Sequence, residues 1–128
     1  MKVQALIVDD SPVVRQIIRF HLTSYHCQIV GEAGHARGAL DLFYKHKPNL
    51  ITLDLMMPSV GKMSAEELFE TVKRESPTTE IVVISAVPFD RIRSKFQVRG
   101  ALDYIVKPVN QFSFQSARHR LARAFPGL

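Results

Sequence analysis

Apolar residues along this chain follow two different spacings, and these predict two kinds of element. Five short runs are almost continuously apolar and rich in β-branched residues, which is typical of strands buried on both faces. The predicted strands are residues 3–8, 28–33, 50–53, 81–84 and 102–106. Strands of this kind belong to parallel sheets that are covered by helices.

Between the strands, apolar side chains recur three or four residues apart, which predicts five amphipathic helices. The core-facing positions are expected to be Val14, Ile17, Ile18 and Leu22; Ala39, Leu42 and Phe43; Leu68, Phe69 and Val72; Ile92, Phe96 and Val98; and Phe114, Ala117, Leu121 and Ala124. Ser11 is placed to cap the first helix, with Pro12 at its first position. Ser64 and Glu67 form a capping-box pattern before the third helix. Pro88 is expected to open the fourth helix at its first position.

Strands that alternate with helices predict an α/β fold. Right-handed crossovers favour a doubly wound five-stranded parallel sheet of order 2-1-3-4-5 with five helices, a flavodoxin-like architecture. We expect residues 1–128 to form a single domain. Functional sites of such sheets lie beyond the carboxyl ends of the strands, so the chemistry is sought there.

The composition of the chain excludes a disulfide-stabilised protein and a membrane-spanning one. Apolar residues make up 46% and charged residues 23% of the 128 residues, as in an ordinary globular domain. Cys27 is the single cysteine, which excludes an intrachain disulfide, and its apolar surroundings predict a small core residue. A membrane span needs about 20 consecutive apolar residues, and the runs here are far shorter. The first acidic residue is Asp9, which leaves too short an apolar stretch before it for a signal peptide. We therefore expect a cytoplasmic protein without membrane insertion.

Basic residues exceed acidic ones by 17 to 12, and much of the excess lies in two late segments. These segments hold Arg91, Arg93, Lys95 and Arg99, and Arg118, His119, Arg120 and Arg123. The pattern fits the solvated surfaces of two helices, or a surface for an acidic partner. Because no nucleic-acid motif accompanies it, nucleic acid is not the expected partner.

Polar side chains that could bind a metal or take part in a reaction follow four of the predicted strands. Asp9 and Asp10 follow the first strand, and Asp54 follows the third. Ser85 follows the fourth strand, and Lys107 follows the fifth. Converging carboxylates repel one another, and Mg²⁺ relieves this repulsion because it prefers oxygen ligands. A metal, a lysine and a hydroxyl can together stabilise phosphoryl transfer, and a carboxylate can be the nucleophile.

Four stretches, taken in order, resemble the receiver domains of response regulators in two-component signalling. They are LIVDDSPVVRQ, LITLDLMMP, VVISA and GALDYIVKP, and the resemblance extends over nearly the whole chain. It implies a phosphoacceptor switch of the single-domain type, with Mg²⁺ as cofactor, rather than an enzyme.

The resemblance also implies roles for individual residues of the site. Asp54 would accept the phosphoryl group, and Lys107 would hold it. Asp10 would ligate Mg²⁺ directly, and Asp9 would do so largely through water. Asp54 and the backbone carbonyl of Met56 would complete the protein's ligands.

Two further residues would carry the switch. Ser85 would turn toward the new phosphoryl oxygens, and Tyr104 would rotate inward when Ser85 moves. The bond between Lys107 and Pro108 is expected to be cis, as is usual in this family. The switched surface would be the face built from the fourth helix, fifth strand and fifth helix.

The family resemblance implies a histidine kinase or a phosphotransfer protein as the phosphodonor partner. The output partner, contacted through that same face, stays undefined, and a homodimer is also conceivable. Two alternatives remain: a pseudo-receiver that binds partners without being phosphorylated, and a receiver that is part of a larger regulator.

The sequence departs from the family pattern around the site. The loop of residues 59–64 is longer than usual by about three residues, which loop-closure costs tolerate but which could also alter phosphodonor choice or kinase docking. Met56 and Val87, two residues beyond Asp54 and Ser85, are apolar and cannot orient an attacking water. We therefore predict slow self-dephosphorylation. Met56 also argues against a phosphatase of the haloacid dehalogenase type, which has a second aspartate at that position.

Overall fold

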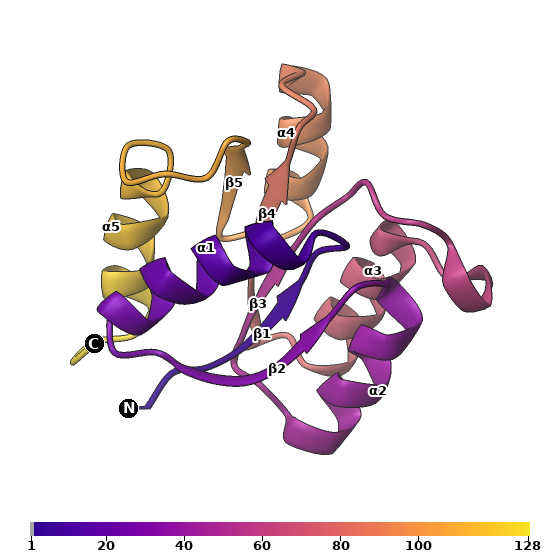
Figure 1. Cartoon of the computed structure of the whole chain (residues 1–128), viewed down its shortest axis with the longest axis horizontal. Helices are drawn as coiled ribbons and strands as arrows, with labels where there is room; N and C mark the ends of the chain where they lie inside the picture. Colours follow the sequence, from indigo (N-terminus) through magenta and orange to yellow (C-terminus); the bar gives the residue numbers. More distant parts are fainter. Residues whose placement is uncertain (1) are drawn as a thin grey trace.

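The strands and helices alternate along the chain in the computed structural model, which describes residues 2–128 (Figure 1). The elements are β1 (Gln4–Val8), α1 (Pro12–Ser24), β2 (Gln28–Ala33), α2 (Ala36–His46), β3 (Leu50–Leu53), the short 3₁₀ helix η1 (Val60–Lys62), α3 (Ala65–Glu75), β4 (Glu80–Ser85), α4 (Asp90–Val98), β5 (Asp103–Val106) and α5 (Gln115–Ala124). Met1, which the single-domain prediction includes, lies outside the described residues.

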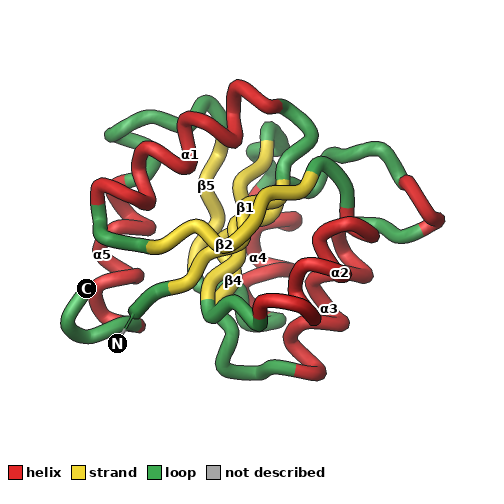
Figure 2. Tube along the Cα trace, turned by 60° about the horizontal axis from the view of Figure 1, so that its bottom comes forward, coloured by secondary structure: helices red, strands yellow, loops and turns green. Residues whose placement is uncertain are grey.

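The sheet confirms the predicted topology. Its five strands are all parallel and lie in the order β2-β1-β3-β4-β5. In Figure 2 the strands form a twisted central layer, with α1 and α5 on one face and α2, α3 and α4 on the other. The predicted strands agree with the observed ones to within a residue at each end.

Each inner strand alternates its side chains between two separate cores, as the pleat requires. On β1, Leu6 and Val8 pack with α2 and α3, whereas Ala5 and Ile7 pack with α1 and α5. Cys27 lies in the second core, as predicted, and burial raises the pKa of its thiol to about 11. Both faces of the sheet are therefore largely apolar, and the polar side chains of the predicted site lie at the carboxyl ends of the strands.

The predicted helix starts are mostly confirmed. Ser11 accepts the Val14 N–H at the start of α1, and Ser64 and Glu67 form the reciprocal capping box of α3. The prediction for Pro88 is wrong, because α4 begins at Asp90 with Phe89 as its capping residue. Pro88 instead lies in the extended loop before the helix, where its fixed φ is equally acceptable.

Two predicted core positions are exposed in the structure, and a third is buried but lies outside its predicted helix. Ile17 is 37% exposed and Val98 is 87% exposed, so neither belongs to the core. Phe114 is buried as predicted, but it precedes α5 as its capping residue. Among residues 2–128, no helix combines the length and apolar character that a membrane crossing requires.

Candidate functional site

The carboxyl ends of β1 and β3 bring two aspartates side by side. Val8 and Leu53 are register partners at the ends of these strands, and Asp9 and Asp54 follow them directly. The Asp54 N–H donates to the Val8 carbonyl at 2.9 Å, which extends the pairing by one residue. Both aspartates are essentially inaccessible to solvent, at 0% and 1% exposure.

The turn after β1 is fixed by its own hydrogen bonds. Asp9 Oδ1 accepts the Ser11 N–H at 2.9 Å, and Ser11 in turn caps α1. The Asp9 N–H donates to the Ala33 carbonyl of β2 at 3.0 Å. Asp10, between these fixed residues, is exposed.

Asp54 lies in surroundings that disfavour its charge. Its Oδ1 accepts the Met56 N–H at 3.0 Å, and its Oδ2 accepts from Lys107 Nζ at 3.2 Å. Loss of solvent raises the pKa of Asp54, and the neighbouring charge of Asp9 raises it further. The Met56 N–H and Lys107 oppose this shift without cancelling it.

Lys107 reaches both buried carboxylates from the end of β5. Its Nζ lies 2.8 Å from Asp9 Oδ2 and 3.2 Å from Asp54 Oδ2. Burial alone would lower the pKa of Lys107, but the hydrogen bond to Asp9 and the charges of Asp54 and Asp9 together raise it. The Lys107–Pro108 bond is cis, as the family resemblance implied.

Ser85 and Tyr104 both bind the backbone of Val87, a residue that the sequence analysis considered only for its apolar side chain. Ser85 is fully buried, and its Oγ accepts the Val87 N–H at 3.2 Å. The Tyr104 hydroxyl donates to the Val87 carbonyl at 2.7 Å, with its side chain packed inward at 4% exposure. The guanidinium of Arg93 lies over the Tyr104 ring, 5.6 Å from its centre. Both predicted switch residues thus hold the loop between β4 and α4, and Tyr104 is already packed inward, whereas the resemblance implied an inward rotation that follows the movement of Ser85.

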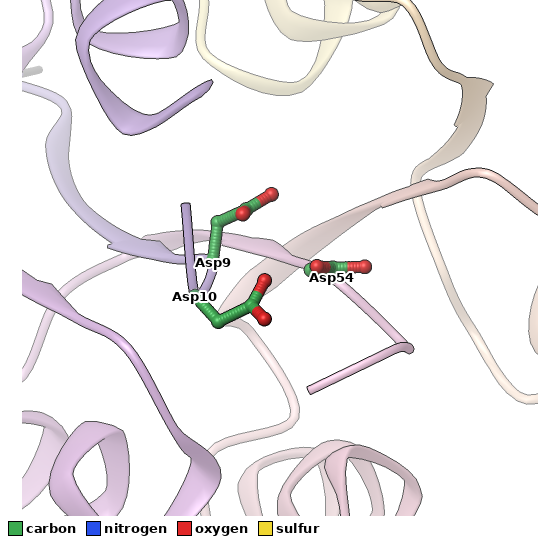
Figure 3. A group of neighbouring side chains, drawn as sticks. All are labelled: Asp9, Asp10 and Asp54. Atoms are coloured by element: carbon green, nitrogen blue, oxygen red, sulfur yellow. The ribbon is translucent and has the colours of Figure 1, made fainter. Parts of the chain in front are cut away.

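Asp9, Asp10 and Asp54 form a group that suits a metal ion. One carboxylate oxygen from each lies within 4.8 Å of the others, and Figure 3 shows the three side chains converging from two strand ends. The donors are all hard oxygens, and one ammonium group does not balance three carboxylates. Mg²⁺ fits such a site, since it prefers carboxylate oxygens and keeps several of its waters. Met56, the predicted carbonyl ligand, borders the site through its N–H bond to Asp54.

The late basic segments are largely engaged within the protein. Lys95 and Arg99 pair with Glu66 of α3, at 2.6 and 2.8 Å. Arg120 lies 3.7 Å from the buried Asp103, and Arg118 lies over the Tyr25 ring. These contacts support the interpretation as helix surfaces.

Comparison with known proteins gives the family of the chain. The model of the response regulator receiver domain matches residues 5–117. The chemotaxis protein CheY of Thermotoga maritima is 27% identical over 94% of this chain and 98% of its own length. The transcriptional regulatory protein BtsR of Salmonella typhi is 29% identical, but the chain spans only 48% of it. In fold, the chain is similar to a solved structure of the CheX–CheY–BeF₃–Mg²⁺ complex from Borrelia burgdorferi, with a TM-score of 0.83, 24% identity, and coverage of 96% of this chain and 89% of that one.

Proposed function

The chain belongs to the response regulator receiver family of two-component signalling, and we propose that it is a phosphoacceptor switch in which Asp54 receives a phosphoryl group beside Mg²⁺. The observation that carries the proposal is the convergence of Asp9, Asp10 and Asp54 within reach of Lys107 at one end of the sheet. We propose this role for the single domain of residues 1–128, acting in the cytoplasm.

In the proposed reaction, a carboxylate oxygen of Asp54 attacks the phosphorus of a phosphohistidine or an acyl phosphate. The bond from phosphorus to the donor nitrogen or oxygen breaks, and its electron pair leaves with the donor. The Met56 N–H and Lys107 both favour the ionised, nucleophilic form of Asp54. Lys107 can then transfer its contact from the carboxylate to a phosphoryl oxygen.

Mg²⁺ would be held by the carboxylates of Asp10 and Asp54 and the Met56 carbonyl, with Asp9 acting largely through water. When bound, it would neutralise charge on the phosphoryl oxygens. The arrangement of donors supports this assignment, because it supplies an excess of negative charge that Lys107 alone does not compensate.

The proposed output begins at Ser85. If its Oγ turns to a phosphoryl oxygen, it gives up the Val87 N–H, and the loop that Tyr104 also holds is released to rearrange. This would change the face of α4, β5 and α5, where an output protein or a second copy would bind. A histidine kinase or phosphotransfer protein would supply the phosphoryl group.

Intact-protein mass spectrometry after incubation with Mg²⁺ and acetyl phosphate tests the proposal. One added phosphoryl group is expected, and it should be absent without Mg²⁺ and in the Asp54→Ala variant. No adduct from acetyl phosphate or from phosphorylated histidine kinases would contradict the proposal and favour a pseudo-receiver.

The lifetime of the adduct tests a finer point. Met56 is 60% exposed and apolar, and Val87 is apolar, so neither side chain can orient an attacking water by a hydrogen bond. We expect the phosphoryl group to persist beyond minutes after the donor is removed. Loss within minutes would show that another group positions the water.

A further inference from the structure

We infer that Arg15 is a positioning residue for the metal site, because it fixes the peptide that connects Asp9 to Asp10. This inference rests on the proposed function, and it assigns a role to a residue outside the carboxylate group. Arg15 lies on α1, and its Nη1 donates to the Asp9 carbonyl oxygen at 2.6 Å.

The contact matters because Asp10 has no side-chain hydrogen bond of its own within residues 2–128 and is exposed. Within the described residues, no hydrogen bond holds its carboxylate, so the position of the side chain depends on the backbone that carries it. The Asp9 N–H is held by the Ala33 carbonyl at 3.0 Å, and the Asp9 carbonyl is held by Arg15. Together these bonds fix the peptide planes on both sides of Asp9, and the second plane leads directly into Asp10.

Arg15 is itself held in place by β2. Its Nε lies 3.3 Å from Glu32 Oε1, and its side chain is only 21% exposed. Glu32 is also bound by Arg19, one turn further along α1, through its Nε at 2.9 Å. The guanidinium of Arg15 is thus clamped between a carboxylate and the Asp9 carbonyl, whereas Arg19 contacts the carboxylate alone.

This difference provides a matched control. Arg15 and Arg19 carry the same charge, lie on the same helix and share Glu32. Replacing either one removes one positive charge from α1 and one partner of Glu32. Only the replacement of Arg15 also removes the donor to the Asp9 carbonyl, and groups that orient ligands in this way strongly influence metal affinity.

The test is calorimetric titration of Mg²⁺ into the full chain as wild type, Arg15→Gln, Arg15→Lys and Arg19→Gln. For Arg15→Gln we expect Mg²⁺ affinity to fall about tenfold, as is typical when an outer-shell partner is lost, and for Arg19→Gln to change by less than about twofold. Arg15→Lys keeps a cation that can reach the carbonyl, so it should recover part of the affinity.

Phosphorylation from acetyl phosphate separates positioning from general damage to the fold. At saturating Mg²⁺, Arg15→Gln should be phosphorylated within about threefold of the wild-type rate. Only the half-saturating Mg²⁺ concentration should rise, in line with the lower affinity.

A lower rate at every Mg²⁺ concentration would overturn the inference, and so would equal losses of affinity in Arg15→Gln and Arg19→Gln. Equal Mg²⁺ affinities of the wild type and Arg15→Gln would refute the role of Arg15 and leave the proposed function standing. A wild type that neither binds Mg²⁺ nor becomes phosphorylated would instead refute the proposed function, and this inference with it.

Discussion

Two clusters of charged side chains in this protein have similar contact distances but opposite physical characters. At the carboxyl end of the sheet, Lys107 contacts Asp9 and Asp54 at 2.8 and 3.2 Å, and both carboxylates are buried. Between α3 and α4, Lys95 and Arg99 contact Glu66 and Glu70 at 2.5 to 2.8 Å, and all four side chains are well exposed.

The difference lies in burial and in charge balance. The exposed α3–α4 cluster has as many cations as carboxylates, and water screens its interactions. The buried cluster has a surplus of carboxylates, since Asp9 and Asp54 share one lysine, and the exposed Asp10 adds a third carboxylate beside them. A buried imbalance of this kind destabilises the fold unless a cation relieves it, so the cluster is suited to binding, whereas the exposed one only joins two helices.

The largest expected effect comes from removing the lysine of the buried cluster. Lys107→Ala should slow phosphorylation of Asp54 about 100-fold, because the cation that we propose for the phosphoryl oxygens is lost from a largely buried site. The measurement is the initial rate of adduct formation with acetyl phosphate at saturating Mg²⁺, followed by mass spectrometry.

Lys95→Ala is the matched control, since it removes the same charge from the exposed cluster. Its rate should stay within about twofold of the wild type, because screened surface charges act weakly. Comparable losses in the two variants would mean that overall charge, rather than the buried contact, controls the rate.

A second prediction concerns the stability of the metal-free protein. Because burial raises the pKa of Asp54, its ionised form is less favourable in the folded than in the unfolded chain. Asp54→Asn should therefore raise the melting temperature at pH 7 by about 4 °C, equivalent to about 1 kcal/mol. Thermal denaturation followed by circular dichroism in a chelating buffer measures this change.

The pH dependence of the stability difference between Asp54→Asn and the wild type identifies the cause of that difference. A carboxyl whose pKa is raised on folding binds its proton more tightly in the folded state, so stability is lost as pH rises from the unfolded pKa, about 4, through the folded one. The advantage of Asp54→Asn should accordingly shrink as pH falls from 7 toward 4. An advantage that is constant with pH would exclude ionisation as its origin.

Much of this site could be predicted from the sequence, because parallel strands bring their carboxyl ends to one edge. That rule alone brings Asp9, Asp54, Ser85 and Lys107 together from distant parts of the chain, and the structure places them there. Their roles in phosphorylation stay predictions. The family resemblance added residues, such as Tyr104, that position along a strand does not distinguish.

The parts that could not be predicted depend on individual side-chain reach. The bond from Arg15 to the Asp9 carbonyl requires a particular rotamer across the turn from β1 to α1, which spacing does not specify. The sequence does not distinguish the two possible places of Pro88, because its fixed φ fits both the first helical turn and the extended residues before it. Val98 matched the helical spacing, but it ends the short α4 at a point where nothing covers it.

A third prediction separates burial from charge. Thr52 is buried on β3, two residues before Asp54, and its hydroxyl has no hydrogen-bond partner within the described chain. Thr52→Val keeps the shape and removes an unsatisfied polar group, so it should stabilise the protein by about 1 kcal/mol. Urea denaturation measures the gain. A loss of stability would mean that the hydroxyl has a partner, such as a buried water.

The smallest effect is expected in the exposed cluster. Hydrogen bonding from Lys95, supported by Arg99, lowers the pKa of Glu66, so its ionised form is slightly favoured by folding. The stabilisation is present above the unfolded pKa of Glu66 and is lost as pH falls through the lower, folded value. Since its side chain is 40% exposed, Glu66→Gln should cost at most about 0.5 kcal/mol at pH 7 after allowance for screening.

Urea denaturation at pH 7 in low and high salt provides the check for Glu66→Gln. The cost should vanish in high salt because a short Debye length removes most of the attraction. Exposed ion pairs contribute at most about 1 kcal/mol. A larger cost that persists in high salt would mean that the two clusters differ less in the strength of their charge interactions than their burial indicates.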